Sequence, residues 1–311
     1  MRTKQDTKKI DIKIVAPASK MPGEAQCIEE IKHLFKSHGE FRLNVSSDIF
    51  DRSDLFCAAS LENRKKDFLE GLTSDKIDIL WAYRGGYGSM EIIPYLEQHR
   101  PFRAFKLLIG FSDITALHLY FNQVLKWPSL HATVLDRIAR GVNSTDLQDI
   151  IDCIGKCKKD LSYTVVPLNM KAKELTTSDE IISGDTIGGN FSVIQHSMGT
   201  CWQLNGNNKI IFFEDVGERG YKIRSKLEQF KQANMFSSAK AIIFGEFIGG
   251  AEKNGKDHTG LVIESFASQI NIPVFRMSQV GHTDVNKPLF LGCMGRIHKG
   301  IISIPNPLKE R

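Results

Sequence analysis

The chain has 311 residues, which is long enough for two domains that each bury a core. Its hydrophobic fraction of 41% and its charged fraction of 25% are ordinary for a globular protein. The formal net charge of +5 is not gathered into the dense basic stripe of a nucleic-acid binder, and no apolar run is long enough for a membrane helix. We therefore expect neither nucleic acid nor a membrane as a partner.

Residues 1–9 are polar and basic and lack the apolar stretch of a secretory signal. After them, short apolar runs alternate with stretches of helical spacing. In chain order these predict a strand at 12–15, a helix at 23–37, a strand at 41–45, a helix at 61–72, a strand at 77–81, a helix at 90–98, a strand at 106–110 and a helix at 113–125. Such alternation is typical of βαβ units in a parallel sheet, whose ligand site lies at the carboxyl ends of the strands.

The second half of the chain has a different pattern. Residues 156–180 are lysine-rich, contain Pro167 and show no clear helical stripe, so we expect a linker there. Beyond it, strands are predicted at 209–213, 241–244 and 301–304, and helices at 221–232 and 258–268. The predicted class is α/β, with an N-terminal parallel-sheet α/β domain at 1–155 and a smaller, β-rich mixed domain at 181–311.

The six cysteines are scattered and none has CxxC spacing. Cys153 and Cys157 are four residues apart and would share a helix face, but no nearby histidine completes a set of metal ligands. Reduced thiols in a cytoplasmic protein are the simpler interpretation. We expect no metal and no other cofactor.

A candidate nucleophile follows the strand at 106–110, where Gly110-Phe111-Ser112-Asp113 leads into a helix. A serine on a sharp strand-to-helix turn exposes its hydroxyl, and the next amide points to where an oxyanion would form. Ile114 stands where the usual motif has its second glycine. The same residues also fit a serine that caps a helix. We call residues 110–113 the nucleophile turn.

A glycine-rich segment, Arg84-Gly85-Gly86-Tyr87-Gly88-Ser89, follows the strand at 77–81. Glycines let backbone N–H groups approach a ligand closely, so this segment, the glycine loop, could hold a phosphate or supply donors to an oxyanion. It matches neither a P-loop nor G-x-G-x-x-G. A tight turn without a ligand remains the alternative.

Two further segments offer an acid and a base. Glu214, Asp215 and Glu218 follow an apolar strand, where one carboxylate could orient a histidine, or the group could be a solvated acidic turn or a magnesium site. His282 follows Gly281 and could act as a general base, although one of nine histidines in a loop is weak evidence. His118 is expected to face the helix packing.

Taken in order, these segments resemble the L,D-carboxypeptidase (muramoyltetrapeptide carboxypeptidase) family, whose superfamily includes the microcin-immunity serine peptidases. The resemblance spans nearly the whole chain. It is carried by Ile14-Val15-Ala16-Pro17, the glycine loop, the nucleophile turn, Gly188-Gly189-Asn190, Glu214-Asp215 and Gly281-His282.

The resemblance implies a catalytic triad in which Ser112 is the nucleophile, His282 the base and Glu214 the residue that holds the imidazole. It implies an oxyanion hole made by the Asp113 amide and an amide of Gly85 or Gly86. The remaining candidates, Arg84 and Glu218, would shape the substrate pocket. The site would lie in the groove between the domains of a protein that forms a homodimer.

The implied reaction is that of a serine-type carboxypeptidase in peptidoglycan recycling: release of terminal D-alanine from murein tetrapeptides. Alternatives are a microcin-immunity-like hydrolase of aminoacyl-sulfamoyl nucleotides or peptide conjugates, a non-catalytic peptide-binding relative, and a nucleotide-binding module that uses the glycine loop. The family usually has His-Gly-Pro where this chain has His131-Ala132-Thr133, and often proline where Phe290 stands. These departures leave the substrate open.

Overall fold

The computed structural model describes residues 9–20, 23–141, 144–155 and 157–309. The chain forms two compact units. Of the described residues, the first contains those up to Ile114 together with those between Thr133 and Ser144, and the second contains Thr115–Ala132 and those from Thr145 onward. The chain therefore passes from the first unit to the second immediately after the nucleophile turn.

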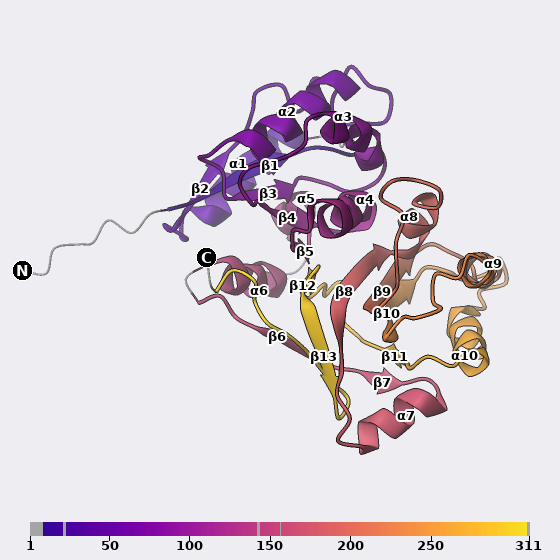
Figure 1. Ribbon diagram of the computed structural model, residues 1–311. Helices are drawn as coiled ribbons and strands as arrows, with labels where there is room; N and C mark the ends of the chain where they lie inside the picture. Colours follow the sequence, from indigo (N-terminus) through magenta and orange to yellow (C-terminus); the bar gives the residue numbers. More distant parts are fainter. Residues whose placement is uncertain (1–8, 21–22, 142–143, 156, 310–311) are drawn as a thin grey trace, which may run out of the picture. The chain divides into compact units, whose positions relative to one another are not determined.

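The first unit is built on a parallel sheet in the order β4-β3-β1-β2 (Figure 1). Its strands are β1 (Ile10–Val15), β2 (Phe41–Asn44), β3 (Ile79–Ala82) and β4 (Leu107–Gly110). Its helices are α1 (Glu24–Phe35), α2 (Leu61–Thr73), η1 (Ser89–Ile92), α3 (Ile93–Gln98), η2 (Ser112–Ile114) and α5 (Leu135–Ala139). Every residue of β3 and of β4 is buried, as in a sheet covered on both faces.

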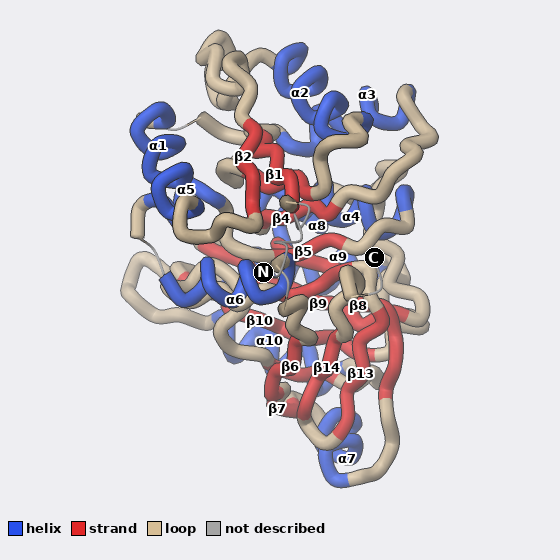
Figure 2. The backbone as a smooth tube through the Cα atoms, turned by 90° about the vertical axis from the view of Figure 1, so that its left-hand side faces the viewer, coloured by secondary structure: helices blue, strands red, loops and turns tan. Residues whose placement is uncertain are grey.

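The second unit is built on a mixed sheet in the order β6-β14-β13-β8-β9-β10-β11-β7, whose strands are drawn in red in Figure 2. Its strands are β6 (Leu161–Thr164), β7 (Val166–Pro167), β8 (Ile182–Asn190), β9 (Lys209–Val216), β10 (Ala241–Ile248), β11 (Val274–Arg276), β13 (Met294–His298) and β14 (Ile301–Ile304). Strands β8 to β11 pair in parallel, and the outer strands pair antiparallel to them and to one another. Separately, β5 (Ser129–His131) pairs antiparallel with β12 (Leu289–Leu291).

The second unit also contains helical segments, of which η3 is a π-helix. They are α4 (Thr115–Leu119), η3 (Tyr120–Leu125), α6 (Ser144–Ile154), α7 (Met170–Thr177), α8 (Phe191–His196), α9 (Gly220–Gln232) and α10 (Thr259–Gln269). Aromatic rings from α8, α9 and β9 pack together, with the Phe191 ring 5.1 Å from that of Phe213 and 5.2 Å from that of Phe230. This core holds β9, and with it Glu214, in place.

The α/β class and the parallel N-terminal sheet are confirmed, and the expected first-half elements match the observed ones within a few residues. The helix at 90–98 divides into η1 and α3 because Pro94, which lacks a backbone N–H, lies in the first turn of α3. The helix at 113–125 divides into η2, α4 and η3.

The division of the chain differs from the expected 1–155, 156–180 and 181–311. Residues 161–177 hold β6, β7 and α7, and both strands belong to the second unit's sheet. Residues 115–132 also belong to the second unit, because α4 packs on β8, where the Asn190 amide donates to Thr115 Oγ1 at 2.8 Å. The second unit thus takes in more of the chain than 181–311. Within the described residues, no helix is long and apolar enough to cross a membrane.

Candidate active site

The nucleophile turn places Ser112 at the carboxyl end of β4 with φ of 61°. This left-handed conformation is uncommon for a residue other than glycine, and such strain gathers at active sites. A helix-capping serine has extended backbone angles instead, so the capping alternative does not describe Ser112. A side chain at Gly110 would lie 2.9 Å from Ile114, which is why this position of the turn needs glycine.

The glycine loop lies directly against this turn. A Cβ atom added to Gly85 would stand 2.9 Å from Ser112 Cβ and 3.2 Å from its hydroxyl oxygen. The loop is fastened to the turn by Asp113, whose Oδ2 accepts from the Ser89 amide at 2.8 Å and whose carbonyl accepts from Ser89 Oγ at 2.6 Å. Gly85, Ser112 and Asp113 therefore come together within the first unit.

A methyl group at Gly85 is expected to push the glycine loop away from Ser112. We expect the Gly85→Ala variant to lose roughly 100-fold in kcat while remaining folded, because a displacement of about 1 Å at a reacting centre has an effect of that size. Gly39→Ala is the matched control, since a Cβ atom there would meet nothing within 4 Å. Steady-state kinetics and thermal unfolding of both variants test this, and equal kcat in both would contradict it.

The residues expected to be the acid and the base, Glu214 and His282, lie together within the second unit. His282 Nδ1 lies 2.6 Å from Glu214 Oε2, and the Glu214 side chain is fully buried. Gly281 has φ of 136°, and a Cβ atom there would stand 3.2 Å from Glu214 Cβ. Only glycine lets the backbone pass so close to the carboxylate. With Nδ1 engaged by the acid, Nε2 is the ring nitrogen that would handle a substrate's proton.

Glu214 is held as an anion by two histidines. Burial alone would raise its pKa, but attraction to His282 and His131 and the hydrogen bond with His282 outweigh burial and lower the pKa from 4.5 to about 2. His131 Nε2 lies 3.8 Å from Oε1, the carboxylate oxygen that does not contact His282. The sequence marks His131 only as part of a departure from the family pattern, so its place beside Glu214 was not predicted.

Glu214 and Asp215 are neighbours in sequence but lie on opposite faces of β9, as successive strand residues do. Asp215 faces α8, where its Oδ2 accepts from Ser192 Oγ at 2.6 Å and its Oδ1 accepts from Asn190 at 2.9 Å. Both carboxylates are buried, so this segment is neither a solvated acidic turn nor one acidic cluster.

The two residues expected to shape the substrate pocket already have charged partners. Arg84 Nη1 donates to Asp136 Oδ2 at 2.7 Å, and Glu218 Oε1 lies 3.2 Å from Lys226 Nζ. Asp136 is buried and also accepts from Arg140 at 2.8 Å. Both Arg84 and Glu218 keep partly exposed side chains.

His118 and the residues that depart from the family pattern lie in the packed interior. His118 is buried, with Nδ1 2.8 Å from Ser129 Oγ, so it faces the packing as expected. Ala132 and Phe290 are buried too, and Phe290 pairs with Leu130 across β12 and β5. The Thr133 carbonyl accepts from Trp81 Nε1 at 3.0 Å.

Comparison with known proteins relates both units to one family. The LD-carboxypeptidase N-terminal domain matches residues 12–132, and the LD-carboxypeptidase C-terminal domain matches residues 183–297. These segments fall within the expected ranges 1–155 and 181–311. The first contains the glycine loop and the nucleophile turn, and the second contains Glu214 and His282.

Three proteins illustrate the similarity. The chain is 35% identical to a protein of Rickettsia conorii named "Putative carboxypeptidase RC0549", over 94% of this chain and 89% of that one. It is 24% identical to the murein tetrapeptide carboxypeptidase of Pseudomonas aeruginosa, over 89% of each. The solved structure of MccF in complex with glutamyl sulfamoyl guanosine shares the fold with a TM-score of 0.77 at 17% identity, covering 95% of this chain and 96% of that one. The chain belongs to the LD-carboxypeptidase family.

Proposed function

We propose that this member of the family is a serine-type carboxypeptidase that releases terminal D-alanine from murein tetrapeptides through an acyl-enzyme on Ser112. The observation that carries the proposal is the buried Glu214–His282 pair, joined at 2.6 Å. A carboxylate that is buried, ionised and bonded to Nδ1 fixes the imidazole tautomer and stabilises the imidazolium that forms when Nε2 takes a proton. That is the role of the acid in a serine-hydrolase triad.

In the proposed reaction, His282 Nε2 removes the Ser112 proton as the hydroxyl oxygen attacks the carbonyl carbon of the scissile amide. Neutral serine is a poor nucleophile, so the attack needs this base. The tetrahedral intermediate collapses when the imidazolium protonates the leaving amine of D-alanine and the C–N bond breaks. Water then attacks the ester with the same base, and the serine is restored. No step uses a metal ion.

The negative charge on the tetrahedral oxygen needs hydrogen-bond donors. We propose that the Asp113 amide and an amide of Gly85 or Gly86 supply them. The packing of Gly85 against Ser112 and the bonds from Ser89 to Asp113 support this, since they hold the two segments together before substrate binds. Each such donor contributes roughly 3 kcal/mol to the transition state in well-studied hydrolases.

The substrate part of the proposal is tested by incubating the purified protein with a murein tetrapeptide and measuring free D-alanine. The protein is expected to release D-alanine, and its Ser112→Ala variant is not. Equal release by both would contradict the role of Ser112. Release by neither would contradict the murein substrate, and aminoacyl-sulfamoyl nucleotides would then be tested, because MccF was solved with such a compound.

We further propose that the protein works in the cytoplasm as a homodimer, as the family resemblance implies. None of the six cysteines, all of them among the described residues, forms a disulfide, which suits a reducing compartment. Sedimentation equilibrium at micromolar concentration measures the mass of the particle. A mass near 35 kDa, that of one chain, would contradict the dimer.

A further inference from the structure

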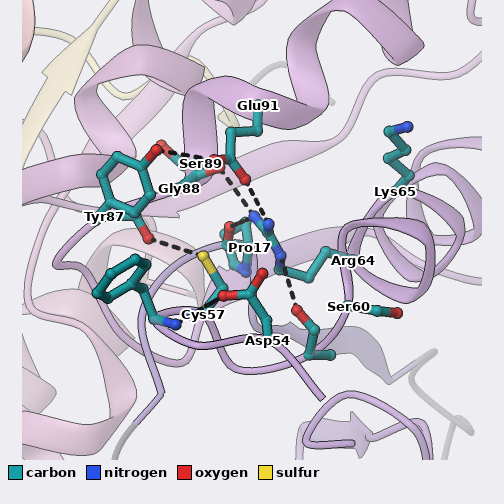
Figure 3. Close-up of polar contacts among 12 residues, drawn as sticks. Pro17, Asp54, Cys57, Ser60, Arg64, Lys65, Tyr87, Gly88, Ser89 and Glu91 are labelled. Atoms are coloured by element: carbon teal, nitrogen blue, oxygen red, sulfur yellow. Dashed lines mark hydrogen bonds and ion pairs between the residues drawn. The ribbon is translucent and has the colours of Figure 1, made fainter. Parts of the chain in front are cut away.

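The residues that hold the glycine loop in place include a buried arginine that takes no part in the proposed chemistry. Arg64 lies on α2, and only 1% of its side chain is exposed. A guanidinium group is costly to bury unless its donors are satisfied, so its partners identify what it does. Figure 3 shows the Arg64 guanidinium between Pro17, Gly88 and Glu91.

Arg64 binds the backbone of three separate segments. Its Nη1 donates to the carbonyl of Pro17 at 2.9 Å and to that of Gly88 at 3.0 Å, and its Nε donates to the carbonyl of Ala59 at 3.2 Å. Pro17 lies in the turn after β1, which we take as residues 16–19, and Gly88 belongs to the glycine loop. One side chain thus ties the loop to the turn after β1 and to the start of α2.

The fourth contact of Arg64 reaches the glycine loop by a second route. Its Nη2 donates to Glu91 Oε2 at 2.5 Å, and Glu91 Oε1 accepts from the Tyr87 hydroxyl at 2.9 Å. The carboxylate therefore bridges Arg64 to a second residue of the loop. The charge on Arg64 is matched by Glu91, and its other hydrogen bonds within the described part of the chain go to main-chain oxygens.

The loop fits this scaffold closely, and a side chain at Gly88 would collide with it. A Cβ atom at Gly88 would lie 2.5 Å from Cys57 Sγ and 3.1 Å from Arg64 Nη1. On the other side, Ser19 of the turn after β1 donates its amide to the Gly85 carbonyl at 3.3 Å, and its hydroxyl accepts from the Tyr87 amide at 3.0 Å. The peptide groups around Gly85 and Gly86 are held at both ends.

We propose that Arg64 is a positioning residue that sets the orientation of the Gly85 and Gly86 amides toward the oxyanion formed at Ser112. The inference rests on the proposed function, since it assigns a role within that oxyanion hole. Arg64 itself does not touch the substrate. Its effect passes from Gly88 and Tyr87 through the loop to Gly85, which packs against Ser112.

The test compares Arg64→Lys with Lys106→Met. A lysine at position 64 keeps the charge but cannot reproduce the planar set of donors. Lys106 is also buried and also donates to main-chain carbonyls, those of Ser74 at 2.7 Å and Ile77 at 2.5 Å. It precedes β4 at the amino edge of the sheet, opposite the edge that carries Ser112. The control thus removes similar buried bonds from the same unit without touching the loop.

Two rates are measured for each variant. The temperature is chosen from thermal unfolding curves so that every variant is folded. One is the reaction of Ser112 with a fluorophosphonate, which needs an oxyanion hole but no peptide substrate. The other is D-alanine release. Arg64→Lys is expected to slow both by roughly 10- to 100-fold with KM within about threefold, whereas Lys106→Met changes neither rate by more than about threefold. Fluorophosphonate rates equal to the control's would overturn the inference.

The outcomes also separate this inference from the proposed function. If the unsubstituted protein reacts with the fluorophosphonate but releases no D-alanine, the proposal of a murein substrate is wrong. The role of Arg64 is then decided by the rate of the fluorophosphonate reaction alone. If Ser112 does not react at all, the serine mechanism and the role of Arg64 fail together. If Arg64→Lys raises KM and leaves kcat unchanged, Arg64 does not act through the oxyanion hole.

Discussion

The Ser112→Ala variant is expected to lose roughly 10⁴- to 10⁶-fold in kcat, the loss seen when the nucleophile of a serine hydrolase is removed. The bond to the substrate carbonyl cannot form without the hydroxyl oxygen, while the proposed amide donors of Gly85 or Gly86 and of Asp113 remain. D-alanine release measures the loss, and circular dichroism shows whether the variant is folded. A kcat within tenfold of the original value in a folded variant would contradict the assignment of Ser112.

The backbone at Ser112 provides an independent check on the same residue. With φ of 61°, a glycine at position 112 avoids the strain that an alanine keeps. We expect Ser112→Gly to be as inactive as Ser112→Ala but more stable than it by about 1 kcal/mol in denaturant unfolding. This pattern would show that the strained conformation is kept for chemistry. Greater stability of the alanine variant would contradict the strained turn.

Replacing Glu214 with glutamine is expected to lower kcat by roughly 10⁴-fold while leaving Ser112 and His282 in place. The amide of the new side chain would still fill the buried site, but it lacks the charge that stabilises the imidazolium, and it can present its NH₂ group to Nδ1. The wrong tautomer would then face the serine. Steady-state kinetics of Glu214→Gln measure the loss, and Glu246→Gln, close to Gly281 but outside the proposed triad, is the control.

The same carboxylate predicts a pH dependence of stability. Its pKa in the folded chain, about 2, lies below the ordinary value of 4.5. The unfolded chain therefore binds this proton first as the pH falls, so Glu214 stabilises the fold above about pH 4.5 and loses that contribution as the pH falls toward 2. The difference in unfolding free energy between the original protein and Glu214→Gln is expected to shrink from pH 6 to pH 3. A difference that grows would contradict the ionised state of Glu214.

Much of the first unit could be predicted from local sequence. The apolar strands before Ser112 and before the glycine loop, each followed by a helix, fix the parallel sheet and place both segments at its carboxyl edge. The left-handed backbone of Ser112 agrees with a nucleophile turn and excludes the capped helix that the sequence left open. Here short-range pattern and structure agree because each βα unit is local in sequence.

The residues that sequence reasoning missed depend on distant partners. Arg64 sits in a charged helix, where an arginine is usually solvated. It is buried because the carbonyls of Pro17 and Gly88, from two distant segments, converge on it together with that of Ala59. His131 contacts Glu214 from 83 positions away in the chain, and no spacing rule links them. The second unit includes Thr115, whose hydroxyl accepts from the Asn190 amide, a pairing that periodicity does not encode.

The most direct test of the account is to react the protein with a fluorophosphonate and to locate the label by peptide mass spectrometry, alongside His282→Asn. The account predicts a single label on Ser112, formed at least about 10³-fold more slowly when His282 is replaced, because the serine then lacks its base. A label on a different residue, or equal labelling rates in the two proteins, would contradict a mechanism in which His282 activates Ser112.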